Sequence, residues 1–209
     1  MRAIAIREDV RDLILDAAGR LLVRYGYTKM TMDDLAREVG VAKGTLYLHF
    51  PSKEEVVLSR IDRMVGHLVE ELRGIATSDQ ELVARLREML ITRVLYRFDA
   101  ASDYAQSIDE MLASIRAGLL ARRDLHFALE TAVFAELLEE GKRSGELSFR
   151  DTAATAQSLL LATNALLPGS LTVKQLGRRD GVEEKVTNIA ALLIDGLRSR
   201  TATTPRRRS

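Results

Sequence analysis

Residues 31–57, TMDDLAREVGVAKGTLYLHFPSKEEVV, contain two short helical patterns separated by a single glycine. Thr31 is predicted to cap the first helix, and Asp34, three residues later, can complete a capping box. Gly40 is expected to end this helix, because glycine readily takes the left-handed conformation that closes a helix. The second helix is expected over about residues 43–50. The stretch therefore predicts two short helices joined by a tight turn.

Longer helical patterns flank this stretch on both sides. Apolar residues recur at helical spacing over residues 10–25, and Gly26 follows as a natural stop. Ser52 and Glu55 form a second capping pair, after which another apolar stripe runs toward Gly74. Two very short helices cannot bury much surface alone, so the flanking helices must complete their core. This arrangement has the shape of a three-helix DNA-reading unit.

The second short helix leaves a polar face for a partner outside the core. Leu46 and Phe50 lie four residues apart and are expected to face inward. The positions that remain for the outer surface are Lys43, Gly44, Thr45, Tyr47 and His49. Lysine can neutralise a phosphate or reach a guanine edge, threonine can contact a base edge, and tyrosine can hold a phosphate. An ordinary solvated helix face is the alternative interpretation, and the histidine could instead pack against and cap the helix end.

The charge around this stretch is locally positive, although the whole chain is nearly neutral, with 31 basic and 30 acidic residues. The basic side chains between residues 20 and 53 are Arg20, Arg24, Lys29, Arg37, Lys43 and Lys53, against the acidic Asp33, Asp34 and Glu38. A DNA-binding surface must therefore be local rather than spread over the protein.

Preceded by LLVRYGYTKM at residues 21–30, the stretch strongly resembles the signature of the TetR (tetracycline-repressor-like) family of bacterial transcriptional regulators. The match spans about residues 10–60 without insertion. Ala42 departs from it, because many members carry serine at the start of this helix. The resemblance implies that the residues at the DNA are Thr31, Lys43, Thr45, Tyr47, His49 and Lys53. Gly44 has no side chain, so it is expected to let the backbone of this helix come close to the DNA. In this resemblance Lys43 and Thr45 would contact bases. Phosphates would be held by Thr31, Tyr47 and Lys53.

The rest of the chain also has helical patterns. Only three prolines occur and strand-like alternation is missing, which predicts an all-α fold of about nine helices. We expect a helix-turn-helix DNA-binding domain at residues 1–55 and a helical effector-binding and dimerisation domain at residues 56–200. Residues 201–209 are expected to form a disordered basic tail. The resemblance implies a homodimer that pairs through the last two helices, about residues 151–167 and 181–200.

Aromatic and sulfur side chains in the second domain are candidates for an effector pocket. These candidates are Tyr96, Phe98, Tyr104, Met111, Phe127 and Phe134, together with Asn164, and ordinary core packing is the alternative for most of them. A buried Asn164 would need a hydrogen-bond partner, which could be a ligand, the twofold-related subunit or a backbone carbonyl. The carboxylates Asp99, Asp103, Asp109 and Glu110 could favour a cationic ligand, or form a solvated acidic face.

These features predict a cytoplasmic, ligand-responsive regulator, most simply a repressor that a small molecule releases from palindromic double-stranded operator DNA. An activator on the same fold and a helical protein-binding adaptor are the alternatives. No enzyme motif is evident, so neither a catalytic residue nor a cofactor is expected. Cysteine is absent and His67 and His126 stand alone, so no metal site is expected. No stretch of about 18 apolar residues suggests a membrane span.

Overall fold

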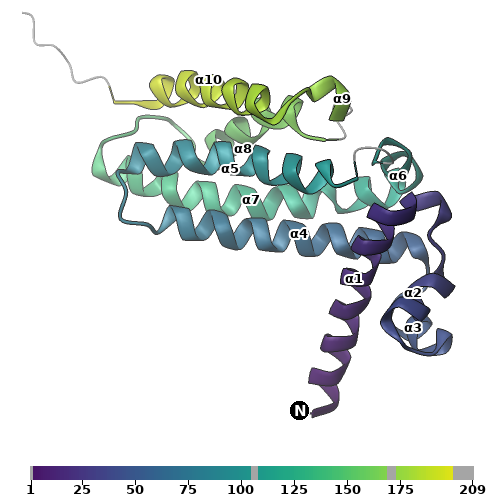
Figure 1. Cartoon of the computed structure of the whole chain (residues 1–209). Helices are drawn as coiled ribbons and strands as arrows, with labels where there is room; N and C mark the ends of the chain where they lie inside the picture. Colours follow the sequence, from purple (N-terminus) through teal and green to yellow (C-terminus); the bar gives the residue numbers. More distant parts are fainter. Residues whose placement is uncertain (1, 105–107, 169–172, 200–209) are drawn as a thin grey trace, which may run out of the picture.

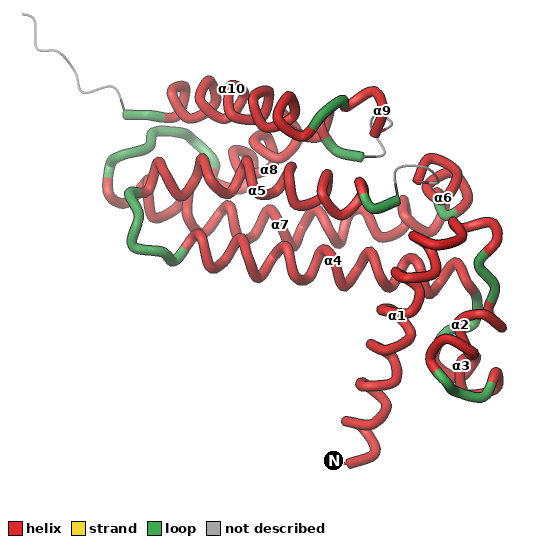
Figure 2. Tube along the Cα trace, viewed as in Figure 1, coloured by secondary structure: helices red, strands yellow, loops and turns green. Residues whose placement is uncertain are grey.

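The computed structural model describes residues 2–104, 108–168 and 173–199, and over these residues the chain is built from helices (Figures 1 and 2). The predicted all-α fold is confirmed, with an isolated bridge between Leu147 and Arg198. The predicted tail at residues 201–209 lies outside the described residues. The helices are α1 (Arg2–Lys29), α2 (Met32–Val39), α3 (Lys43–His49), α4 (Lys53–Ala76), α5 (Leu82–Ser102), α6 (Ile108–Ser114), α7 (Arg116–Ser144), α8 (Thr152–Thr163), the 3-10 turn η1 (Asn164–Leu166), α9 (Val173–Leu176) and α10 (Arg179–Leu197).

Local capping explains why α2 and α3 form where they do. The Thr31 hydroxyl accepts a hydrogen bond from the Asp34 backbone N–H at 3.1 Å, and the Asp34 carboxylate accepts one from the Thr31 backbone N–H at 3.2 Å. The predicted capping box is therefore confirmed. Gly40 closes α2 with a left-handed φ of 77°, also as predicted. Ala42, in contrast, gives α3 no side-chain cap.

Gly26 was expected to end the first helix, and it breaks α1 without ending it. Its φ of 75° and ψ of 169° lie outside the helical region, and a further helical turn follows as far as Lys29. The Gly26 carbonyl accepts a hydrogen bond from the Met30 backbone N–H at 3.2 Å, which closes this turn. The glycine thus turns the chain from the body of α1 toward α2.

Helix α4 belongs to two hydrophobic cores. Its first turns contribute Val56, Val57 and Leu58 to a core shared with α1, α2 and α3, and Ile108 and Met111 of α6 join the same core. Its later turns enter a second core that includes α5, α7, α8 and α10. Figure 1 shows α2 and α3 beside the start of α4, away from the stack of long helices. The domain boundary at residue 55 stays a prediction, since the first core extends beyond it.

The last long helices cover the second core from one side. Helix α8 packs on α7, and α10 packs on α5. Two large apolar side chains nevertheless remain exposed on these outer helices: Leu161 of α8 is 54% exposed and Leu192 of α10 is 76% exposed. These helices, with η1, correspond to the two segments predicted for dimerisation.

Candidate functional site

Helix α3 presents an exposed face beside the glycine turn. Leu46 and Phe50 are fully buried in the first core, in agreement with their predicted inward orientation. Lys43 and Gly44 are exposed, Tyr47 is 45% exposed, and Thr45 is half-buried. Because Leu46 and Phe50 anchor α3 in the first core, the outer face of α3 has a fixed position relative to α1, α2 and the start of α4.

Lys43 is not free on this face, because it is tied to the preceding helix. Its Nζ lies 2.6 Å from Oδ1 of Asp33 on α2, and both side chains are more than half exposed. The hydrogen bond from Lys43 to Asp33, helped by the charge of this carboxylate, raises the pKa of the lysine. Any anion that approaches Lys43 must compete with Asp33.

Two of the proposed phosphate contacts also take part in holding the fold together. The Thr31 hydroxyl caps α2, and the Lys53 Nζ donates a hydrogen bond to the Tyr27 carbonyl oxygen at 2.8 Å. The same Nζ lies 4.3 Å from the centre of the Tyr27 ring, and burial lowers the pKa of Lys53. His49 is half-buried at the end of α3. The role of all three residues at DNA stays a prediction.

The sequence interpretation overlooked Leu48 as a surface residue of α3. Its side chain is 74% exposed, the largest fraction among the exposed large apolar residues of this region. It lies four residues after Gly44, and residues at this spacing share one helix face. That spacing was the available signal. An exposed leucine here can contact an apolar group such as a thymine methyl.

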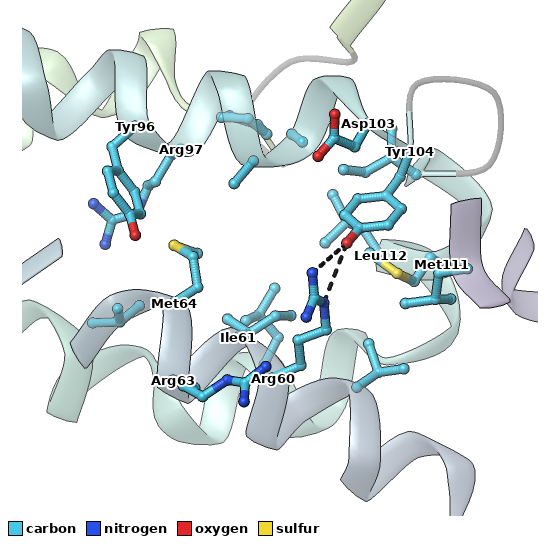
Figure 3. Close-up of a pocket in the computed structure, with 18 of the residues that line it drawn as sticks. Arg60, Ile61, Arg63, Met64, Tyr96, Arg97, Asp103, Tyr104, Met111 and Leu112 are labelled. Carbon is cyan, nitrogen blue, oxygen red and sulfur yellow. Dashed lines mark hydrogen bonds between the residues drawn. The ribbon is translucent and has the colours of Figure 1, made fainter. Parts of the chain in front are cut away.

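A second candidate site is a cavity of about 640 Å³ between α4 and α5, with α6 at one end (Figure 3). Of the seven predicted effector-pocket residues, Tyr96, Tyr104 and Met111 line this cavity. The other four lie elsewhere: Phe98 and Phe134 are buried in apolar clusters, Phe127 packs against the second core, and Asn164 bonds within the fold. Ordinary core packing thus explains the aromatic members of this second group.

Asn164 has a partner that was not among the anticipated ones. Its Oδ1 accepts a hydrogen bond from Nη2 of Arg93 at 2.8 Å. Arg93 in turn lies 2.6 Å from the carboxylate of Glu130, which also binds Arg97 at 2.5 Å. Burial raises the pKa of Glu130, but the charges and hydrogen bonds of the two arginines outweigh burial and hold this pKa below its ordinary value. The sequence signal was the four-residue spacing of Arg93 and Arg97.

The acidic residues near the cavity do not form a common cation site. Asp99 pairs with Arg179 of α10 at 2.9 Å, and Glu110 accepts a hydrogen bond from Thr28. Asp103 and Asp109 are exposed to solvent. Among the residues that the structure describes, no group of three His, Cys, Asp or Glu side chains could hold a metal ion. In the same part of the chain, no helix has the length and apolar character needed to span a membrane.

Comparison with known proteins gives consistent similarities. The profile of a family described as "Bacterial regulatory proteins, tetR family" matches residues 14–59. The fatty acid metabolism regulator protein of Bacillus subtilis is 26% identical over 72% of this chain and 77% of its own length. The HTH-type transcriptional repressor BepR of Brucella suis is 28% identical over 77% of this chain and 79% of its own length.

A solved structure extends the similarity to the fold. The fatty acid degradation regulator FadR from Bacillus halodurans superposes with a TM-score of 0.62 and is 25% identical. The alignment covers 91% of this chain and 97% of that one. The similarity therefore includes the helices around the cavity as well as α1 to α3.

Proposed function

The chain belongs to the tetR family of bacterial regulatory proteins, and from this membership we propose that it is a ligand-responsive repressor. In this proposal it acts in the cytoplasm as a homodimer on palindromic operator DNA. The observation that carries the proposal is the outer face of α3, where Lys43, Gly44 and Tyr47 are exposed beside a capped α2 and a glycine turn. The curated relatives that support it include a transcriptional repressor.

The α3 face fits the major groove of DNA in its chemistry. Lys43 can bind a phosphate or a guanine edge, Thr45 a base edge, and Tyr47 a phosphate. The two α3 helices of a twofold dimer would bind half-sites whose centres are about 34–36 Å apart, or a multiple of this distance. We propose that the dimer forms through α8 and α10, because the exposed Leu161 and Leu192 offer apolar surface there.

Helix α4 offers a route between the cavity and the DNA-binding face. It begins directly after α3, and its residues Val57, Ile61 and Met64 line the cavity. An effector that prefers a subunit arrangement with the wrong α3 spacing would weaken DNA binding by its differential affinity for the two arrangements. A coupling of about 1–3 kcal/mol is typical of such systems and would relieve repression.

The proposal is tested by a mobility shift with DNA from upstream of the gene, using the wild-type protein and a Lys43→Ala, Tyr47→Ala double variant. We expect the double variant to bind at least about tenfold more weakly, because it loses a cation and a phosphate contact. Both side chains are exposed, so the fold should persist.

The matched control is Arg87→Ala, which removes an exposed cation from α5, away from this face. Unchanged binding of this control would show that the loss is specific to α3. Equal affinity of the double variant and the wild type would exclude α3 as the reading helix. A folded dimer that does not prefer this DNA over random DNA at low salt would favour the adaptor interpretation.

The contact between Asp33 and Lys43 leads to a second prediction. Asp33→Asn is expected to strengthen operator binding several-fold at low salt, because it frees Lys43 and removes a negative charge that repels phosphate. The gain should shrink as salt rises. Titrations at several salt concentrations measure both effects, with Asp109→Asn, at an exposed position of α6, as the charge-matched control. Weaker binding by Asp33→Asn would mean that the contact positions Lys43 for DNA.

A further inference from the structure

Arg60 lines the cavity and, among the residues that the structure describes, forms no ion pair with an aspartate or glutamate. Its Nε and Nη2 donate to the Tyr104 hydroxyl oxygen at 3.2 and 2.7 Å, and its Nη1 donates to the Leu15 carbonyl oxygen at 3.2 Å. All these acceptors are neutral. Within the described residues, no Asp or Glu oxygen lies within 4.0 Å of its guanidinium nitrogens. Figure 3 shows Arg60 reaching from α4 across the cavity to Tyr104.

The other two arginines of the cavity wall are already paired. Arg63 lies 3.1 Å from a carboxylate oxygen of Asp12 and 2.5 Å from one of Asp16. Arg97 is held by the buried Glu130. A bidentate pair between an arginine and a carboxylate is stronger than hydrogen bonds from the arginine to neutral oxygens. A guanidinium that has only neutral acceptors can therefore exchange them favourably for a carboxylate. Arg60 is therefore the cation that an anionic ligand can bind without first breaking an ion pair.

The remaining surface of the cavity is largely apolar. Apolar side chains that line it include Leu22, Ile61, Met64, Met111, Leu112 and Leu119. A volume of about 640 Å³ is in the range that holds a small organic molecule. Asp103, the one lining acid without an ion pair among the described residues, is exposed, and its carboxylate lies away from Arg60 in Figure 3. Solvent therefore screens its repulsion of an anion.

From this geometry we propose that the cavity binds a carboxylate with an apolar body, and that the head group of this ligand pairs with Arg60. The inference rests on the proposed function, because this ligand would be the effector. It differs from the cationic ligand that the acidic residues had suggested: Asp99 is paired with Arg179, and Asp103 and Asp109 face solvent.

Arg60 also connects the cavity with the DNA-binding part of the chain. Besides the bond to the Leu15 carbonyl of α1, its guanidinium packs against Gly19, where an added Cβ would lie only 2.6 Å from Cζ. A carboxylate that binds Arg60 competes with both Tyr104 and Leu15 for its donors. Ligand binding thus changes a contact between α4 and α1, whose apolar face supports α2 and α3.

The test is calorimetric titration of the full-length protein without DNA, using decanoate, 1-decanol and decylammonium as probes. We expect decanoate to bind more tightly than the other two. Arg60→Gln should weaken decanoate binding about tenfold or more, since it removes a hydrogen-bonded charge. Arg60→Lys keeps the charge and should restore part of the affinity. Arg87→Gln, on the exposed side of α5, should change nothing.

Circular dichroism and thermal unfolding check that each variant is folded. The inference is overturned if decanoate does not bind the wild-type protein, if 1-decanol or decylammonium binds as tightly, or if folded Arg60→Gln keeps wild-type affinity for decanoate. A mobility shift then separates the two proposals. If the protein binds operator DNA and decanoate does not weaken this binding, the inference alone is refuted. If the protein binds decanoate but shows no preference for operator DNA, the proposed function alone is refuted.

Discussion

Glu130→Ala is expected to lower the free energy of unfolding by about 3–5 kcal/mol, because it leaves buried cations without a counter-charge. The side chains of Glu130 and Arg93 are each only 2% exposed, and the Glu130 carboxylate pairs with both Arg93 and Arg97. The remaining acceptors of Arg93 are the neutral oxygens of Leu160, Thr163 and Asn164. Urea unfolding followed by circular dichroism measures the loss.

Glu183→Ala is the matched control, since it also removes a carboxylate that binds an arginine, Arg179, at 3.0 Å. The side chains of Arg179 and Glu183 are 51% and 49% exposed, so the removal of Glu183 should cost no more than about 1 kcal/mol. The ionised Glu130 stabilises the fold fully above its ordinary pKa of 4.5 and loses this effect as pH falls through the lower pKa of the folded state. The difference between wild type and Glu130→Ala should therefore narrow below pH 4.5. Equal losses for the two variants would contradict the buried ion-pair assignment.

Phe50→Ala is expected to destabilise the first core by about 3–5 kcal/mol and to abolish operator binding with it. The Phe50 ring is fully buried and follows α3 directly. Helices α2 and α3 have eight and seven residues, so packing rather than intrinsic helix stability must hold them. Thermal unfolding, hydrogen exchange of residues 32–49 and a mobility shift measure the effect.

Tyr47→Ala is the control that distinguishes a loss of folding stability from the loss of a DNA contact. Tyr47 lies three residues earlier and is 45% exposed, so its replacement should change the free energy of unfolding by only about 0.5 kcal/mol. It should still weaken DNA binding, because it removes a proposed phosphate contact. If Phe50→Ala instead keeps both its unfolding midpoint and its DNA affinity, α3 does not depend on the first core.

The local part of this structure could be predicted from sequence because its causes lie within a few residues. The capping of α2 needs only Thr31 and Asp34, and the inward face of α3 needs only the four-residue spacing of Leu46 and Phe50. Such contacts do not depend on how distant helices pack. The same reasoning identified the exposure of Lys43, although not its bond to Asp33.

The cavity could be predicted only in part, because its lining depends on how distant helices pack together. Tyr96 and Phe98 are two residues apart on α5, yet one lines the cavity and the other enters an apolar cluster. The Arg60–Tyr104 contact spans 44 residues of sequence. Sequence spacing cannot reveal such a contact, so aromatic residues were proposed by type, whereas the arginine that bridges the cavity was overlooked.

The first core includes residues of α4 and α6, and this limits how parts of related regulators can be joined into chimaeras. A fragment cut at residue 55 would lack Val56, Val57 and Leu58, and also Ile108 and Met111 of α6. Its remaining helices would expose the apolar surface that these side chains cover. The segment up to residue 55 therefore cannot be moved into another protein as an independent folding unit. A chimaera that exchanges operator specificity between relatives must keep each recognition segment with its own α4 start and α6, or replace only the outer residues of α3.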